Sequence, residues 1–215
     1  LAILAGSRSM PGALAMTVKS AITSGVGLVT AFAPESIVAQ LACQLPEAMW
    51  KIWPETPEGG LALEGLWQIK AIADKASCLL AGPGMGSDAE SQALLREVGK
   101  VWSKAAVLDA DALRPAVVDA FASKAGSEVV VTPHDGEFMR LTEGSSCSDA
   151  ALLAYAKSKR ITVVKKGANT RISDGTTLCV NPSGNAVLAR GGSGDLLAGL
   201  IAGLLAEKGS AALET

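Results

Sequence analysis

Residues 78–113 read CLLAGPGMGSDAESQALLREVGKVWSKAAVLDADAL, and this stretch decides the expected fold. It begins with an apolar run, Cys78–Ala81, that predicts a buried strand and is followed by a glycine-rich turn. A helical pattern, Asp88–Lys100, then carries acidic residues in its first turn. A second apolar run, Ala105–Leu108, ends at Asp109. Strand, helix and strand in this order indicate parallel strands of one sheet that is buried on both faces.

The same alternation continues in both directions along the chain. Further strands are expected at Leu1–Ala5, Gly27–Ala33, Glu128–Val131 and Ile161–Val164. Further helices are expected at Ala13–Ser24, Ser148–Lys159 and Asp195–Glu207, the last ending near Gly209. The glycine- and proline-rich stretch Pro54–Gly60 is expected to form a surface loop. The pattern predicts a doubly wound α/β protein with a mostly parallel sheet, in which residues 1–215 form a single domain.

The amino-acid composition argues against several classes of function. Of the 215 residues, 49% are hydrophobic but only 4% are aromatic, so the core is expected to be aliphatic. The net charge of -2 and the few aromatic side chains argue against nucleic-acid binding. A single histidine, His134, excludes a histidine-rich metal site, and four cysteines without a CxxC pair indicate buried thiols in a reducing compartment. The longest apolar run, Leu196–Ala206, is too short to span a membrane, so we expect a cytoplasmic protein.

Polar or glycine-rich turns follow four consecutive expected strands. These turns are Gly82–Gly86, Asp109–Asp111, Thr132–Glu137 and Lys165–Gly167. Ligands of doubly wound sheets bind beyond the carboxyl ends of the strands. We therefore expect a ligand site where these four turns meet.

Two of these turns allow more than one interpretation. The glycine turn lacks the last glycine of a dinucleotide-binding fingerprint, because Ser87 stands there, and this disfavours classical Rossmann binding. Asp109 and Asp111 could orient a metal or a water, or Asp111 could cap the next turn. No third type of metal ligand is near them in the sequence, so capping is the preferred interpretation and no metal ligand is assigned.

The turn at Thr132 has the sequence pattern of a helix start. Thr132 is the expected N-cap, Pro133 the first helical residue, and Asp135 an acid in the first turn. This capping pattern gives the side chain of His134 no role. We therefore expect its imidazole to contact a substrate on the rim of the sheet.

The stretch Arg190–Asp195, RGGSGD, is the most informative segment of the chain. Its three glycines allow consecutive backbone N–H groups to converge, and the helix that follows points its positive dipole end at the same place, so an anion hole is expected. Asp195 is either an N-cap or the group that accepts a proton from an attacking hydroxyl during phosphoryl transfer. A serine-hydrolase elbow is excluded because Asp195 occupies its last glycine position.

Taken together, these motifs resemble the carbohydrate-kinase-like domain of the NAD(P)HX dehydratases, within the ribokinase-like superfamily. The segments that carry the resemblance are 5–13, 25–30, 82–86, 108–113, 132–138, 166–170, 181–185 and 191–199. The resemblance implies an α/β three-layer αβα sandwich with a mostly parallel central sheet. It also implies a reaction in which ADP or ATP phosphorylates the hydroxyl of a hydrated nicotinamide ring, and loss of phosphate then restores NADH or NADPH.

The resemblance further implies roles for individual residues. Asp195 matches the base that activates the substrate hydroxyl, and it also contacts the hydrated dinucleotide, NADHX or NADPHX. The other residues matched to substrate binding are Ala13, Gly86 and His134. The residues matched to adenine-nucleotide binding are Lys166, Gly167, Ala168, Asn169 and Thr170, together with Gly191, Gly192, Ser193 and Gly194 in the anion hole. Mg²⁺ is the implied cofactor.

The resemblance also implies a homotetramer and a functional partner, the NAD(P)HX epimerase. No epimerase domain is recognisable in the chain, and the C-terminal helices usual in the family are expected to be absent. A small-molecule kinase of the same superfamily, acting on a vitamin-precursor or sugar hydroxyl, is the alternative function. A non-catalytic nucleotide-binding protein is a third.

Overall fold

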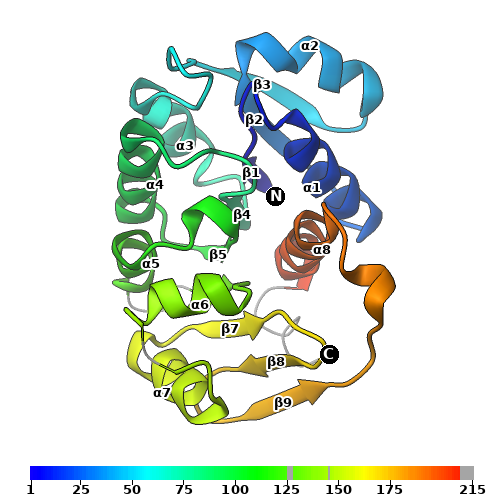
Figure 1. The fold of residues 1–215 in the computed structure, drawn as a ribbon. Helices are drawn as coiled ribbons and strands as arrows, with labels where there is room; N and C mark the ends of the chain where they lie inside the picture. The colour runs from blue at the N-terminus through cyan, green and yellow to red at the C-terminus, as the bar shows by residue number, and fades with distance from the viewer. Residues whose placement is uncertain (125–127, 145, 209–215) are drawn as a thin grey trace.

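A computed structural model describes residues 1–124, 128–144 and 146–208 (Figure 1). Its strands form one sheet in the order β3-β2-β1-β4-β5-β6-β7-β8-β9. The pairs β7–β8 and β8–β9 are antiparallel, and all the other pairs are parallel. The bounds are β1 Ala2–Leu4, β2 Thr30–Pro34, β3 Met49–Trp53, β4 Cys78–Ala81, β5 Ala105–Leu108, β6 Val129–Val131, β7 Thr162–Lys165, β8 Thr170–Ser173 and β9 Leu178–Asn181.

Helices cover both faces of this sheet (Figure 1). The bounds are α1 Pro11–Thr23, α2 Glu35–Gln44, α3 Leu66–Ile72, α4 Ala89–Val101, α5 Pro115–Ala122, α6 Asp135–Leu141, α7 Asp149–Lys159 and α8 Ser193–Lys208. Short 3-10 turns lie at η1 Leu63–Gly65, η2 Ala110–Ala112 and η3 Ala186–Leu188. The expected α/β sandwich with a mostly parallel sheet is confirmed.

The six expected strands and four expected helices are all present, with bounds that differ by at most three residues. The expected helix end near Gly209 lies outside the described residues. Strands β3, β8 and β9 were not expected from the sequence. They lie at the two ends of the sheet, where several of their side chains are exposed, so their sequences lack the continuous apolar run of a doubly buried strand.

Alternating side chains of the central strands divide the core between the two faces. Ile3, Leu80, Val107 and Val130 pack with α1 and α8, whereas their neighbours in the strands pack with the helices of the opposite face. α8 approaches α1 closely because glycines form the contact: a Cβ at Gly199 would clash with the backbone oxygen of Thr17. Among the described residues, no helix combines the length and hydrophobicity needed to cross a bilayer.

Candidate active site

The turns at the carboxyl ends of β1 and β4 are joined directly. The amide of Gly6 donates to the oxygen of Pro83 at 2.7 Å. Gly82 has a φ of 121°, and a Cβ there would clash with the backbone oxygen of Asp109, so only glycine fits. Gly84 also has a positive φ, and a Cβ on it would lie 2.8 Å from the Cβ of Ala13. These contacts place the start of α1 against the glycine turn that follows β4.

A buried carboxylate, Asp109, organises the centre of the site. It follows β5, and its Oδ1 accepts hydrogen bonds from Thr132 Oγ1 at 2.7 Å and from Lys166 Nζ at 2.8 Å. The expectation that Thr132 caps a helix is therefore wrong. Its hydroxyl is used by Asp109, because β5 and β6 are neighbours and end at the same level of the sheet.

Asp111 holds the glycine turn. Its Oδ2 accepts from the amide of Gly86 at 2.9 Å, and its backbone oxygen accepts from Gln92 Nε2. The preferred interpretation, that Asp111 caps the turn after β5, is wrong, since Asp111 reaches across to the neighbouring loop instead. Among the described residues, no group of three histidine, cysteine or acidic side chains is arranged to hold a metal ion.

His134 is the N-cap of α6. Its Nδ1 accepts from the amide of Glu137 at 3.2 Å, and Glu137 Oε2 accepts from the amide of His134 at 2.8 Å, which together form a capping box. The interpretation that capping leaves this imidazole unexplained is therefore wrong. The ring is still 59% exposed, so its outer surface is free to contact a ligand.

Lys166 connects three elements at the end of β7. Its amide donates to the oxygen of Pro133, its ammonium donates to Asp109, and Glu137 Oε2 lies 3.7 Å from the same nitrogen. A Cβ added at Gly194 would lie 3.4 Å from this ammonium. The first turn of α8 thus sits directly over the Asp109–Lys166 ion pair.

Asp195 lies in that first turn and is half-buried. Burial raises its pKa to about 6, the negative charges of Asp109 and Asp111 add to the rise, and the charge of Lys166 opposes it. A carboxylate whose pKa lies this close to neutrality is a stronger base than an ordinary aspartate.

The backbone around Asp195 suits an anion. Gly192 has a φ of 86° and accepts from the amide of Leu196 at 3.0 Å, so the helix begins at once. The first amides of a helix have no partner within it, and the positive end of the dipole lies there. Arg190 and Gly191 are exposed at this entrance.

The remaining residues matched to nucleotide binding lie in the turn between β7 and β8. Gly167, Ala168 and Asn169 are exposed there, and Thr170 begins β8. A Cβ at Gly184 would lie 3.7 Å from the oxygen of Ala168, so this turn lies beside the exposed segment that leads to α8. The structure thus gathers Lys166, Gly194 and Asp195 at one point and leaves residues 167–170 on an open surface next to it.

Three residues of the central cluster were not assigned to the site from the sequence. They are Asp109, Thr132 and Glu137. Asp109 accepts hydrogen bonds from Thr132 and Lys166, and Glu137 lies near the same Lys166 ammonium. Asp109 directly follows a buried strand, and this was the available signal. Its partners lie 23 and 57 residues away, and local sequence patterns do not reveal contacts at that separation.

The fold is that of a ribokinase-like protein, and the site places a half-buried carboxylate, Asp195, in the first turn of a helix. A family model described as NAD(P)H-hydrate dehydratase matches residues 1–214. The chain belongs to this family. It is 33% identical over 211 residues to the ADP-dependent (S)-NAD(P)H-hydrate dehydratase of Xanthomonas campestris, an alignment that covers 95% of this chain and 71% of that protein.

Two further comparisons agree. The chain is 37% identical over 213 residues to the bifunctional NAD(P)H-hydrate repair enzyme Nnr of Gloeobacter violaceus, with 96% of this chain and 40% of the relative covered. The chain thus spans about 40% of the length of the first curated relatives it matches. The solved ADP/ATP-dependent NAD(P)H-hydrate dehydratase of Bacillus subtilis, co-crystallized with ATP/Mg2+ and soaked with CoA, is 28% identical. Its TM-score is 0.76, with 95% of this chain and 73% of that chain covered.

Proposed function

We propose that the protein repairs hydrated nicotinamide cofactors, converting the S-form of NADHX or NADPHX back to NADH or NADPH with ADP or ATP as co-substrate. The hydroxyl oxygen of the hydrated ring attacks the terminal phosphorus of the nucleotide, and AMP or ADP leaves. The phosphate ester then breaks at its carbon–oxygen bond, the ring loses a proton, and inorganic phosphate departs. The proposal is supported by the family membership together with the chemistry of the site.

The observation that carries the proposal is the environment of Asp195. Its carboxylate lies at the helix end where the transferred phosphoryl group would be held, and its pKa of about 6 suits it to accept the hydroxyl proton at neutral pH. The first amides of a helix have no partner within it, and those of α8 would lie beside the developing negative charge. A base and an anion hole in one helical turn are the two parts that this reaction needs from the protein.

We assign the nucleotide to the side of α8 that faces the β7–β8 turn. Lys166 supplies a positive charge beside Gly194, and the backbone of residues 167–170 is open to solvent there. The hydrated dinucleotide is assigned to the opposite side, against Ala13, Gly86 and His134. Ala13 packs against the glycine turn that follows β4. The exposed imidazole of His134 follows β6, which is two strands away from β4 in the sheet.

Mg²⁺ is proposed to enter with the nucleotide. The described residues do not form a three-ligand metal site, so the ion does not fit as a resident cofactor of the protein. Mg²⁺ commonly keeps several waters and is held largely by substrate phosphates, which fits a site of this kind.

The test is restoration of NADH absorbance when the protein is mixed with NADHX, Mg²⁺ and either ADP or ATP. Release of AMP or ADP in equal amount should accompany it. Failure with both nucleotides would remove the proposal, and a stable phosphorylated product would point to a kinase instead. Running the two nucleotides side by side also decides the preference between them.

The epimerase is the proposed functional partner. The bifunctional names of the first curated relatives, of which this chain spans about 40%, support a link between the two activities in those proteins. Addition of a separate NAD(P)HX epimerase should raise the yield of NADH from a mixture of NADHX epimers, because the R-form is then converted to the form that this protein uses.

A further inference from the structure

The strand order places a crevice between β1 and β4. β1 is followed along the chain by β2 and β3 on one side, and β4 by β5 and β6 on the other, so the winding direction reverses between them. Ligands of open α/β sheets bind at such a switch point, and a dinucleotide lies with its two halves on opposite sides of it. The proposed function uses Ala13, which follows β1, together with Gly86, His134 and Asp195. The ends of β2 and β3 have no assigned role.

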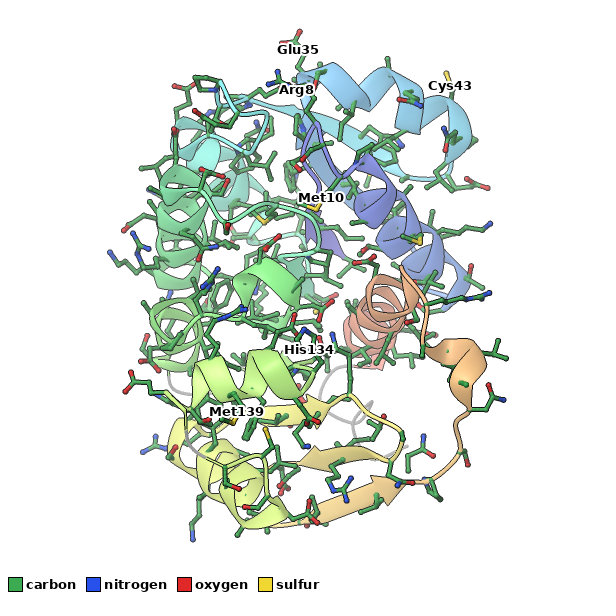
Figure 2. The ribbon with its side chains drawn as sticks, in the orientation of Figure 1. Arg8, Met10, Glu35, Cys43, His134 and Met139 are labelled. Carbon is green, nitrogen blue, oxygen red and sulfur yellow. The ribbon has the colours of Figure 1, made fainter. Side chains whose placement is uncertain are left out.

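A shallow depression that is open to solvent, with a volume of about 530 Å³ and called the cavity below, lies at those strand ends. Its size is within the range of small-molecule sites. The lining residues are Arg8, Glu35, Ser36, Glu55, Thr56 and Pro57. In Figure 2, Arg8 and Glu35 lie close together at one end of the rim, with Met10 between them and His134. Met10 also packs near Gly84 of the glycine turn.

The polar groups of the cavity are held in place. Arg8 donates through Nη1 to Glu55 Oε1 at 2.9 Å and through Nη2 to the oxygen of Pro57 at 2.8 Å. The second carboxylate oxygen of Glu55 accepts from the amide of Ser36 at 3.2 Å. Glu35 directly follows the last residue of β2. The cavity therefore holds two carboxylates and one guanidinium, and the guanidinium is already paired.

The distances suit a dinucleotide. Neighbouring strands are about 4.8 Å apart, so three to four strand intervals, from β5 to β2 or β3, span about 14 to 19 Å. Two nucleosides joined by a pyrophosphate extend over a span of this kind. In Rossmann sheets, whose glycine fingerprint this chain lacks, a carboxylate binds the ribose hydroxyls of NAD, and a nearby arginine accommodates the 2′-phosphate of NADP.

We propose that this cavity binds the adenosine half of the hydrated dinucleotide, with Glu35 and Glu55 accepting hydrogen bonds from the ribose hydroxyls, and that it thereby favours NADHX over NADPHX. The inference rests on the proposed function for the identity of the substrate. A 2′-phosphate placed here would meet two carboxylates and an arginine that already donates to Glu55 and to the oxygen of Pro57. Replacing Glu55 by glutamine releases Arg8, so the preference should move toward the phosphorylated substrate.

The test compares kcat/KM for NADHX and NADPHX in the parent protein and in Glu35→Gln, Glu55→Gln and Glu58→Gln. Glu58 lies in the same loop but does not line the cavity, so its variant makes the same charge change without the proposed contact. We expect the parent to favour NADHX by about tenfold, which corresponds to about 1.4 kcal/mol. The preference should shrink in Glu35→Gln, shrink or reverse in Glu55→Gln, and stay unchanged in Glu58→Gln. Equal use of both substrates by the parent, or an unchanged ratio in both cavity variants, would overturn the inference.

A binding measurement separates this inference from the proposed function. Calorimetric titration with NAD⁺ and NADP⁺, in the presence of excess ADP to fill the nucleotide site, needs no turnover. Tighter binding of NAD⁺ to the parent, lost in Glu55→Gln, supports the cavity assignment even if NADHX is not converted. Absence of any difference between the two dinucleotides overturns it even if NADHX is converted.

Discussion

Replacing Asp195 by asparagine should abolish most of the activity and at the same time stabilise the fold. The carboxyl pKa is raised from 3.8 to about 6, chiefly by burial and then by the nearby charge of Asp109. This rise is equivalent to about 3 kcal/mol of unfavourable free energy for the charged form. Because the carboxylate is only half-buried, solvent screening reduces the effect to about 1 to 2 kcal/mol. Asparagine has nearly the same shape as aspartate but carries no charge. The free energy of unfolding of the variant at pH 7 should therefore be higher than that of the parent by about 1 to 2 kcal/mol.

The pH dependence of this difference follows from the direction of the pKa change. A carboxyl whose pKa is higher in the folded protein than in the unfolded chain binds its proton more tightly in the folded protein. Its favourable contribution is therefore fully present below pH 3.8 and is lost as the pH rises through about 6. The parent and the asparagine variant should consequently have similar stability below pH 3.8, diverge as the pH rises from 3.8 to about 6, and differ by a constant amount above that pH.

Two measurements check this reasoning. Urea unfolding of both proteins at several pH values should show that the free energy of unfolding of the variant is higher by about 1 to 2 kcal/mol near neutral pH. In thermal unfolding, this difference corresponds to a rise in Tm of about 3 to 6 °C. The rate of NADH restoration should fall by a factor of about 10² to 10⁴, the usual contribution of a general base. A variant that is less stable than the parent at pH 7, or one that keeps its activity, would refute the account of Asp195 as a strained base.

Other perturbations give equally direct tests. The rate of the parent protein should fall about tenfold per pH unit below pH 6, because Asp195 becomes protonated, and a pH–rate profile checks this. Lys166→Met removes the cation that lowers the pKa of Asp195 and should move this acid limb to higher pH. Asp109→Asn removes a negative charge and should move it to lower pH; shifts of the same sign in the two variants would contradict the assignment. Gly82→Ala should cost about 3 kcal/mol or more by denaturant unfolding, because its φ is positive and the added Cβ meets the backbone of Asp109. Gly27→Ala, where a Cβ meets nothing, should change stability by less than about 1 kcal/mol.

Much of the fold could be read from local sequence. Each buried strand is a short apolar run, as at Cys78–Ala81, because a strand covered on both faces needs apolar side chains on both. The alternation of such runs with helices then requires a parallel sheet. The edge strands were not recognised because their exposed faces carry polar residues, and of β8 only Thr170 was assigned a role, as the last residue of the predicted nucleotide-binding segment.

The residues of the candidate site also differ in how far local sequence reveals them. Asp195 and the glycines before it were recognisable because a helix start with a carboxylate and freed amides is a local pattern. The capping box at His134 was also local, since Glu137 lies three residues on, but the histidine was not recognised as the cap.

The sequence by itself determined the secondary-structure alternation, the glycine turns and the carboxylate at the start of α8, all of which depend on residues close together in the chain. Only the tertiary structure decided that Asp109, Thr132 and Lys166 meet beneath Gly194, and that Arg8 pairs with Glu55 at the far end of the rim. These contacts follow from which strands are neighbours in the sheet. The elevated pKa of Asp195 depends on the same arrangement, because burial and charge–charge distances exist only once the strands are packed side by side.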